Sequence, residues 1–570
     1  MPDETLRQLA EEYWDAVLEA NPTTATLLGD HRFDDRIEDF SEEAEAEQRA
    51  HWQSILRRAT AVDADSLDVD DAVTRGQLVV ETTDAIALTD AHMVELTSDQ
   101  MTGFHVGLLQ SVPMMSAPDP ESATKMLERF RRVPDALEQL AQRFLEGAAA
   151  GRTPAAICVS RSLNMIEGYL SSPLDDDVLV TLAGPPHNGG NQADWDGEAG
   201  WRAELREIAS EVVRPAYRRL ADTLAGELLP LARDDDHCGL SWLPGGPELY
   251  AALVTHHTSL DLAPEEIHAL GIEEVTKKLP AEYAEVGGRL FGIADPAEVL
   301  ERLRHDRSLR YGSGEEIMAD ARDAFEAASA AMAGWFGRLP QAPCTIEPVP
   351  DFLAADSPVA YYFPPPGDGS RGGTYFVNTD KPENKARYET ASIAFHEAIP
   401  GHHLQLAIAM ELTGLPSFRR FSLTHTAYVE GWGLYAERLA EEMGLYRNDL
   451  DRIGMLAADS MRACRLVVDT GLHALGWTRS QAVDFMVANS PMSVEEVEVE
   501  IDRYIGMPAQ ALAYKLGQRE IFRLRESARA ALGDGFEIKG FHDAVLGSGA
   551  LGLPVLGEVV RRWVDTVSTG

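Results

Sequence analysis

Apolar residues recur at three- and four-residue spacing along most of the chain, with polar residues between them. The pattern is clear over residues 6–20, 123–148 and 203–232. This spacing aligns apolar side chains on one face of an α-helix. Helix-start signals agree, because Asp261 and Ser493 each precede glutamates at capping positions. The pattern therefore predicts a mainly α-helical protein.

The helical pattern is interrupted over residues 339–387, which are rich in proline, glycine and aromatic residues. Two short runs in this segment, Ala360–Phe363 and Gly373–Thr379, have the character of β-strands. The helical pattern then resumes. We therefore expect an N-terminal helical lobe over residues 1–340 and a catalytic lobe over residues 341–570, which begins with a small sheet. Together they are expected to form one continuous structural unit.

The charge of the chain is strongly negative, at −43, and the acidic excess is spread along the whole length. A nucleic-acid-binding protein would carry the opposite charge, so no nucleic-acid partner is expected. An evenly acidic surface is typical of halophilic proteins, which stay soluble in high salt. An acidic funnel for cationic substrates is the alternative, and the even spread favours the first interpretation.

The sequence lacks the usual signals of membrane or secreted proteins. The four cysteines are far apart and form no CxxC pair, which argues against a disulfide scaffold. The N-terminus has no basic start followed by an apolar stretch, and no window holds eighteen uncharged apolar residues. These features predict a cytoplasmic protein without a membrane partner. A homodimer is compatible with the sequence.

The run AFHEAIPGHHLQ, residues 394–405, carries the candidate chemistry. Zinc hydrolases need two imidazoles on the metal and a carboxylate that takes a proton from water. His396 supplies the first ligand, and Glu397 beside it supplies the general base. In the common HExxH motif, the second histidine lies one helical turn after the first. Here Pro400 stands at that position, and the next histidines are His402 and His403.

This spacing requires a distorted helix. In a regular helix, His402 would lie ~120° away from the face of His396, and His403 would lie ~10 Å along the axis. Proline removes a helical hydrogen bond and glycine permits unusual backbone angles. We therefore expect a widened turn or bulge across residues 398–401. Either His402 or His403 can then bind one zinc ion together with His396.

A third ligand is expected on the next helix. Glu430, in HTAYVEGWGLYAE, is the best candidate, and Glu437 is the second choice because it lies two turns further on the same face. Gly431 and Gly433 would allow close helix approach. No cysteine lies near, and three ligands leave a position open for a substrate or water, which favours a catalytic over a structural zinc.

The pair HEAIPGHH and EGWGLYAE resembles the signature of the domain-of-unknown-function 885 family. The likeness extends to EEYWDAVLEANPTTATLLG, TSLDLAPEEIHALGIEEV and YIGMPAQALAYKLGQREIFRLRE. That family is distantly similar to neurolysin-like oligopeptidases and carboxypeptidase Taq, which carry HExGH and a glutamate ligand on the next helix. The resemblance implies a bilobed, zincin-like, mainly α fold with a deep channel. It also favours His402 as the second ligand.

The same resemblance suggests residues that would assist hydrolysis. A late tyrosine stabilises the oxyanion in those peptidases, and Tyr514 matches it by position and type, with Lys515 beside it. Arg503 and Tyr504 are rivals for contacts with the substrate. By likeness to gluzincins, the strand that contains Tyr375 could pair with an extended peptide, although an ordinary hairpin explains it equally well.

One further set of polar residues shares a helix face: Arg462, Arg465, Asp469 and His473. We favour an internal salt-bridge ladder for them. A residue that orients a metal ligand, or an arginine that binds a substrate carboxylate, is the alternative.

The sequence as a whole predicts a zinc-dependent metallopeptidase that acts on short peptides, of carboxypeptidase or oligopeptidase type. A metal-dependent amidase or isopeptidase with a non-peptide substrate is an alternative. An iron oxygenase with two histidines and one carboxylate is less favoured, because it has no need for Glu397 and usually sits on strands. A non-catalytic metal-binding protein is the remaining alternative.

Overall fold

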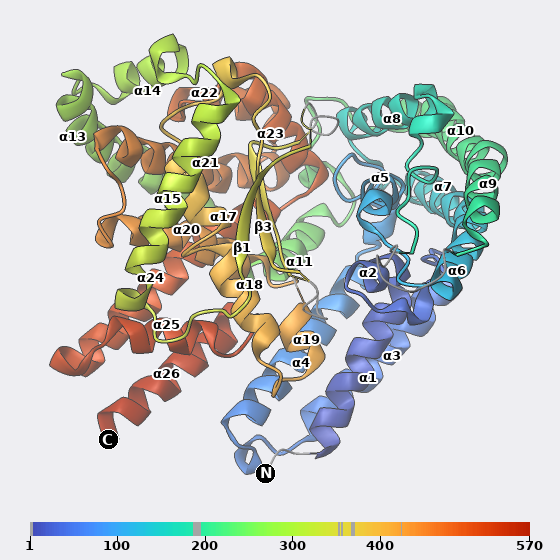
Figure 1. Ribbon diagram of the computed structural model, residues 1–570, viewed down its shortest axis with the longest axis horizontal. Coiled ribbons are helices and arrows are strands. Elements are labelled where there is room, and N and C mark those ends of the chain that lie inside the picture. The colour runs from blue at the N-terminus through green and yellow to red at the C-terminus, as the bar shows by residue number, and fades with distance from the viewer. Residues whose placement is uncertain are drawn as a thin grey trace.

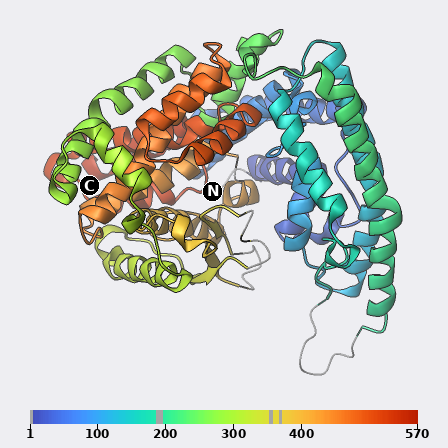
Figure 2. The same ribbon diagram turned by 90° about the horizontal axis from the view of Figure 1, so that it is seen from above.

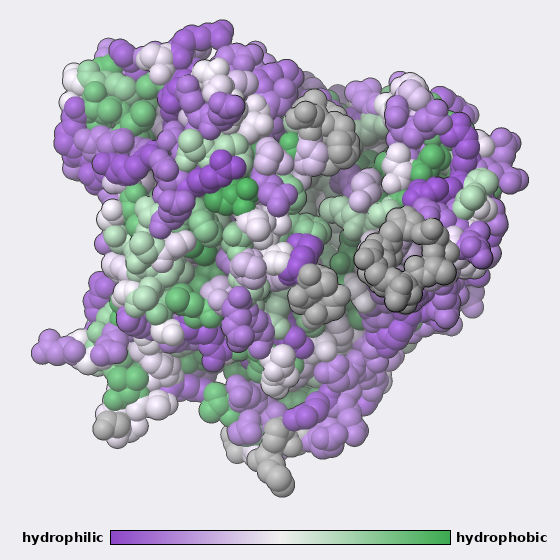
Figure 3. Space-filling model, viewed as in Figure 1, coloured by the Kyte–Doolittle hydropathy of each residue, from purple (hydrophilic) through white to green (hydrophobic). Residues whose placement is uncertain are grey.

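The protein is described by a computed structural model that covers residues 4–185, 195–350, 354, 357–365, 371–422 and 424–569. Helices dominate, which confirms the mainly α prediction. Seen from above, the helices form two sides of an open C (Figure 2). Hydrophilic residues cover most of the face in Figure 3, and the surface is hollowed between the two sides. Among the described helices, none is long and apolar enough to cross a membrane.

The N-terminal part of the chain is built from helices α1 to α10, drawn from blue to green in Figure 1. A π-helical turn at Ala209–Val213 joins α9 to α10, and a second one at Leu224–Leu228 extends α10, so residues 198–228 are helical throughout. Apolar residues between Leu108 and Leu228 form a separate core here. The helices are α1 Glu4–Ala20, α2 Pro22–Leu27, α3 Glu42–Ala61, α4 Val69–Asp90, α5 Phe104–Ser111, α6 Pro120–Arg131, α7 Val133–Ala149, α8 Ala156–Ser171, α9 Glu198–Ile208 and α10 Arg214–Thr223.

The remaining helices pack around the helix pair that carries the HEAIPGHH motif. Ser493 accepts a hydrogen bond from the backbone N–H of Glu496 and caps α23 as predicted, whereas Ala263, not Asp261, is the N-cap of α12. These helices are α11 Gly246–Thr258, α12 Pro264–Glu273, α13 Leu279–Phe291, α14 Pro296–His305, α15 Gly314–Trp335, α17 Thr390–Glu397, α18 His402–Glu411, α19 Ser417–Phe421, α20 Thr426–Glu442, α21 Asp449–His473, α22 Arg479–Asn489, α23 Val494–Gly506, α24 Ala513–Leu532, α25 Ile538–Leu546 and α26 Leu553–Thr569.

The packing divides the lobes differently from the expected boundary at residue 340. Helices α11 to α15 lie with the C-terminal helices, because α11 to α14 share apolar cores with α21, and α15 shares one with α17 and α20. The first helices join the two sides, since Leu6 and Phe418 lie in one apolar cluster. The change of lobe therefore falls between α10 and α11.

A three-stranded sheet, in the order β1-β3-β2, lies beside the motif helix. Its strands are β1 Cys344–Pro348, β2 Ala360–Phe363 and β3 Gly373–Val377. Strand β3 pairs with β1 in parallel and with β2 in antiparallel orientation. The two predicted strands are confirmed, and β1 is an additional edge strand.

Helices α20 and α24 approach each other closely because glycines face each other at their contact. A Cβ atom placed on Gly431 would lie 2.5 Å from the Cα atom of Gly517. A Cβ atom on Gly517 would lie 1.9 Å from the carbonyl oxygen of Ala427. The close approach predicted for Gly431 is thus confirmed, and it sets where Glu430 on α20 and Tyr514 on α24 stand relative to each other.

Gly517→Ala should lower the free energy of unfolding by about 1–3 kcal/mol or more, because the added methyl group meets backbone that cannot retreat. Urea unfolding measures the change. Gly168→Ala is the matched control, since a methyl group added to this exposed helical glycine would have no neighbour within 4 Å. The control should gain about 0.5–1 kcal/mol. Equal stability of the Gly517 variant and the wild type would contradict this account of the contact.

Candidate metal centre

The motif helix is interrupted between its two histidines. Helix α17 ends at Glu397 and α18 begins at His402, with turns over residues 398–401. The expected widened turn is therefore a complete break. A Cβ atom on Gly401 would lie 1.8 Å from the carbonyl oxygen of His396, so only glycine fits there. The indole Nε1 of Trp432 donates to the carbonyl oxygen of Pro400 at 2.9 Å and anchors the break to α20.

The break brings His396, His402 and Glu430 together. The Nε2 atoms of the two histidines lie 3.4 Å and 3.5 Å from Oε2 of Glu430. The imidazole rings are nearly perpendicular, with centroids 4.7 Å apart. Zinc bound tetrahedrally at 2.0–2.1 Å would hold its ligand atoms about 3.3–3.4 Å apart. The two distances to Glu430 are close to this spacing, and the donor atoms of all three residues lie within 4.8 Å of one another, so the group could hold a metal ion.

His403 lies outside this group. Its Nδ1 atom forms a hydrogen bond of 2.9 Å with the Tyr362 hydroxyl on β2. Burial lowers the pKa of the His403 imidazole to about 4, so it is neutral at physiological pH. Of the two adjacent histidines, the fold therefore turns His402 toward His396 and His403 toward the sheet.

Glu437, the second choice for a ligand, lies behind His396 instead. Its Oε1 atom is 2.8 Å from Nδ1 of His396, and its Oε2 atom accepts a hydrogen bond from Ser392 at 2.6 Å. A carboxylate in this position fixes the orientation of the ring, so that Nε2 points at the metal position. Gly433 leaves room for that ring, because a Cβ atom there would lie 2.6 Å from Cε1 of His396.

Two carboxylates flank His396 and influence its charge. Burial disfavours the imidazolium form of His396, but hydrogen bonds to Glu430 and Glu437 outweigh it and raise the His396 pKa to about 9. Burial also opposes the charge on Glu430, yet the two histidines hold the pKa of that carboxyl well below its usual range. Glu430 is thus ionised, and the pair of carboxylates favours positive charge between them.

Two further predicted residues lie beside this group. Burial raises the pKa of Glu397, and the nearby His396 and His402 only partly oppose the shift. The ring of Tyr514 stacks near that of His396, with centroids 6.4 Å apart. Burial raises the pKa of Tyr514 as well, so its phenol keeps its proton at neutral pH.

Of the two interpretations of β3, pairing with an extended peptide is wrong, and the hairpin with β2 is confirmed. Both of its edges are already paired with β1 and β2 over residues 374–377. Tyr375, the residue expected to contact substrate, is only 1% exposed and belongs to the main apolar core. The sequence could not reveal this, because β1 lies in a proline-rich segment without a strand pattern.

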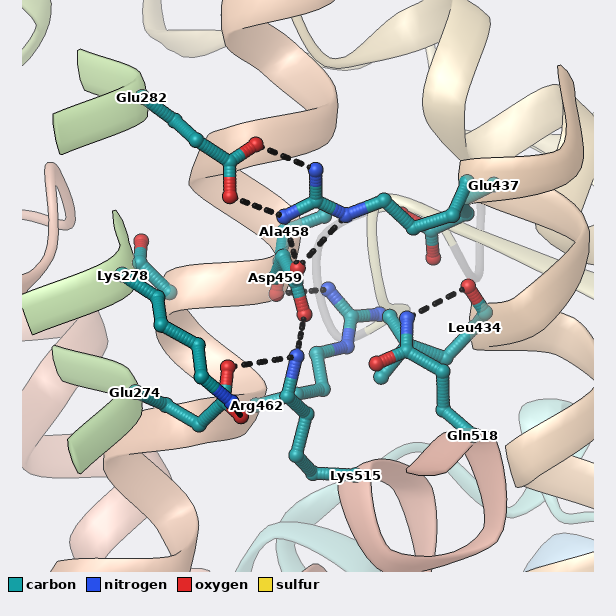
Figure 4. A network of polar contacts seen from close by, with 12 residues as sticks. Glu274, Lys278, Glu282, Leu434, Glu437, Ala458, Asp459, Arg462, Lys515 and Gln518 are labelled. Atoms are coloured by element: carbon teal, nitrogen blue, oxygen red, sulfur yellow. Dashed lines mark hydrogen bonds and ion pairs between the residues drawn. The ribbon is translucent and has the colours of Figure 1, made fainter. Parts of the chain in front are cut away.

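Lys515 also differs from its predicted role. Its ammonium group forms ion pairs with Asp459 and, at 3.6 Å, with Glu274 (Figure 4). Asp459 in turn accepts from Arg438. Lys515 is therefore committed to a buried ion-pair network that joins α21, α24 and α20, and it is not available to substrate.

The polar face of α21 pairs with other elements rather than with itself, so the expected ladder is wrong. Arg465 donates to the Tyr504 hydroxyl at 2.7 Å and to Glu500 at 2.9 Å. Asp469 accepts from the Tyr250 hydroxyl at 2.6 Å. His473 contacts the carbonyl oxygen of Tyr504 at 3.0 Å.

Tyr504 and Arg503, the other candidates for contacts with a substrate, differ in burial and in their contacts. Tyr504 is buried, and its hydroxyl is held by Arg465 and Glu500, so it is not free to contact a substrate. Arg503 is half-buried, and its charge acts on the Tyr514 phenol.

Comparison with known proteins identifies the family. The family model described as "Bacterial protein of unknown function (DUF885)" matches residues 22–560, which confirms the family expected from the motifs. A search of the curated proteins finds no match. The chain is similar to "the putative lipoprotein from Colwellia psychrerythraea", with a TM-score of 0.90, 25% identity, and coverage of 98% of this chain and 99% of that one. It is also similar to "a putative lipoprotein of unknown function from Shewanella oneidensis", with a TM-score of 0.76, 18% identity and the same coverage.

Substitution of the two adjacent histidines should separate their roles. His402→Ala should abolish tight zinc binding, because it removes one of three converging donors. His403→Ala should bind zinc like the wild type, since it removes only a hydrogen bond to Tyr362. Titration against a competing chelator measures the affinity. Equal loss in both variants would contradict the assignment of His402.

Glu437→Gln should weaken zinc binding by roughly 10- to 100-fold, because the ring of His396 loses the carboxylate that orients it. The same titration measures the change. Glu441→Gln is the matched control, since Glu441 lies on the same helix and pairs with Arg452 away from His396. An affinity in Glu437→Gln equal to that of the control would show that Glu437 does not act through the metal ligand.

Proposed function

We propose that this chain, which belongs to the DUF885 family, is a zinc-dependent metallopeptidase that hydrolyses short peptides. The observation that carries the proposal is the convergence of His396, His402 and Glu430 at distances close to the ligand spacing of zinc, with Glu397 beside them. Three protein ligands leave a coordination position open, as in catalytic rather than structural zinc sites.

The residues around the centre supply the groups that peptide hydrolysis needs. The chemistry that zinc contributes in such sites is polarisation of a carbonyl group and acidification of water. Glu397 accepts a proton from the attacking water and returns it to the departing nitrogen. The raised pKa of Glu397 lies closer to neutral pH than that of an ordinary glutamate, which suits the carboxylate to accepting and returning a proton. Tyr514, which keeps its proton, donates a hydrogen bond to the developing oxyanion.

The shape of the molecule supports a preference for short substrates. The surface is hollowed between the two lobes in Figure 3. As part of the proposal, this hollow leads to the metal centre, and a recessed site of this kind would exclude folded proteins. A bilobed, neurolysin-like architecture with a channel is part of the proposal. Hydrolysis of a non-peptide amide or isopeptide bond is the second candidate, because the same groups would serve it equally well.

Glu397→Gln should keep its zinc and lose hydrolysis by roughly 10²- to 10⁴-fold in kcat, because the variant lacks the proton acceptor. Digestion of a mixed peptide library, with product masses mapped, measures the loss. A chelator should abolish wild-type cleavage, and added zinc should restore it.

Elemental analysis of the purified protein provides the control for metal identity. Zinc is expected at one ion per chain, whereas iron would favour the oxygenase alternative. Undiminished hydrolysis by Glu397→Gln would contradict the mechanism.

A further inference from the structure

Three arginines lie near Tyr514, and one of them, Arg462, also lies beside the ion-pair network of Lys515 (Figure 4). Arg462 and Arg465 come from α21, and Arg503 comes from α23. The guanidinium carbons of Arg465 and Arg462 lie 4.5 Å and 5.9 Å from the centroid of the Tyr514 ring. Arg503 is joined to Arg465 through Glu500, which pairs with both of them. We call these three arginines the arginine cluster.

The arginine cluster carries more positive charge than its ion pairs balance. Glu500 pairs with both Arg465, at 2.9 Å, and Arg503, at 3.4 Å. Arg462 has no ion-pair partner within 4.0 Å among the described residues. Its one hydrogen bond there goes to the carbonyl oxygen of Ala458 at 3.4 Å (Figure 4). A single carboxylate is thus paired with two of the three guanidinium groups, and the third has none within ion-pair distance among the described residues.

Three other carboxyl groups, those of Glu397, Glu389 and Asp469, influence these arginines from a greater distance, and burial raises the pKa of each of them. Burial raises the pKa of Asp469 and of Glu389 to about 7, so each is only partly ionised at neutral pH. Asp469 also already accepts hydrogen bonds from Tyr250 and from the backbone N–H of Ala509. Among the described residues, none of these three groups forms an ion pair with the arginine cluster, so its excess charge remains.

The arginine cluster also holds donors that lack an acceptor. Nε of Arg462, Nη1 of Arg465 and Nε of Arg503 are shielded from solvent and have no hydrogen-bond partner in the part of the chain that the structure describes. Arg465 as a whole is only 4% exposed. Buried donors without acceptors are uncommon in folded proteins and are costly. An anion that enters beside Tyr514 would supply the missing acceptors.

We propose that the arginine cluster binds the C-terminal carboxylate of the peptide substrate, so that the enzyme removes residues from the C-terminal end. This inference rests on the proposed peptidase function. Guanidinium groups suit a planar carboxylate, which they can bind with two parallel hydrogen bonds. The arginine cluster lies close to the metal centre, because the Tyr514 ring contacts both His396 and the cluster. This position favours the C-terminal carboxylate of the substrate over a more distant acidic group. An extended chain advances only ~3.3–3.6 Å per residue, so the bound carboxylate lies a few residues at most from the scissile bond.

The test compares binding of three N-acetylated, fluorescently labelled pentapeptides to zinc-loaded Glu397→Gln protein. The first peptide ends in a free carboxylate and the second in an amide. The third ends in an aspartyl amide, which places the charge on a side chain. Because residue 397 is uncharged in this background, an effect of Arg462 cannot arise through the general base. The free acid should bind roughly 10- to 100-fold more tightly than the amide.

Adding Arg462→Gln should abolish this preference, and Arg462→Lys should restore part of it. Arg523→Gln is the matched control, because Arg523 lies on α24 and pairs with Glu520 at the surface. The control should keep the full preference. Equal affinity for acid and amide, or a preference that survives Arg462→Gln, would overturn the proposal. Tightest binding of the aspartyl amide would also overturn it, by assigning the cluster to an acidic side chain.

Incubation of the wild type with the same peptides separates this inference from the proposed function. Release of C-terminal residues from the acid, with little cleavage of the amide, supports both. Acid-selective binding without cleavage of any peptide supports the carboxylate site and contradicts the peptidase. Cleavage at internal bonds at equal rates in acid and amide supports the peptidase and overturns the role of the arginine cluster.

Discussion

The break between α17 and α18 determines the position of every group at the candidate metal centre. A continuous helix would point His396 and His402 in different directions, and the interruption over residues 398–401 turns them toward one point. Gly401 makes the break possible because no side chain fits against the carbonyl oxygen of His396. Trp432 then ties the break to α20, the same helix that presents Glu430 and Glu437. Two consecutive turns of α20 thus carry the anchor and both carboxylates.

Helix α21 links this centre to the rest of the molecule through charge. Along its length, Asp459 joins the network of Lys515 and Arg438, and Arg465 joins Glu500 and Tyr504. Each pair connects α21 to a different neighbouring helix. Breaking a buried pair by removing one partner is costly, because the remaining charge has no solvent to stabilise it. The buried pairs therefore specify how the helices around the centre are arranged.

The sequence predicted the helices and strands better than it predicted which residues far apart in the chain contact each other. Helical periodicity and caps such as Ser493 depend on neighbouring residues, so they can be read locally. The group of His396, His402 and Glu430 could be anticipated because its residue types and spacing carry the chemistry. The role of His403 could not, since adjacent histidines differ only in which way the break turns them. Lys515 and Tyr375 were misjudged for a related reason. Asp459 is far from Lys515 in sequence, and β1 covers an edge of β3 that the pattern left open.

The hydrogen bonds of Glu437 to His396 and Ser392 have a consequence for how the protein acquires an ion. They join protein groups alone, so the imidazole can be oriented before any ligand bond exists. The surrounding core of α15, α17 and α20 is made of apolar side chains, so its packing does not depend on a bound metal ion. Under the proposed function, folding and metal loading would therefore be separate events, unlike those of a zinc finger, which is unfolded without its metal. Occupancy of such a preformed site would follow the concentration of free metal around the folded protein, and the folded chain could exchange one ion for another.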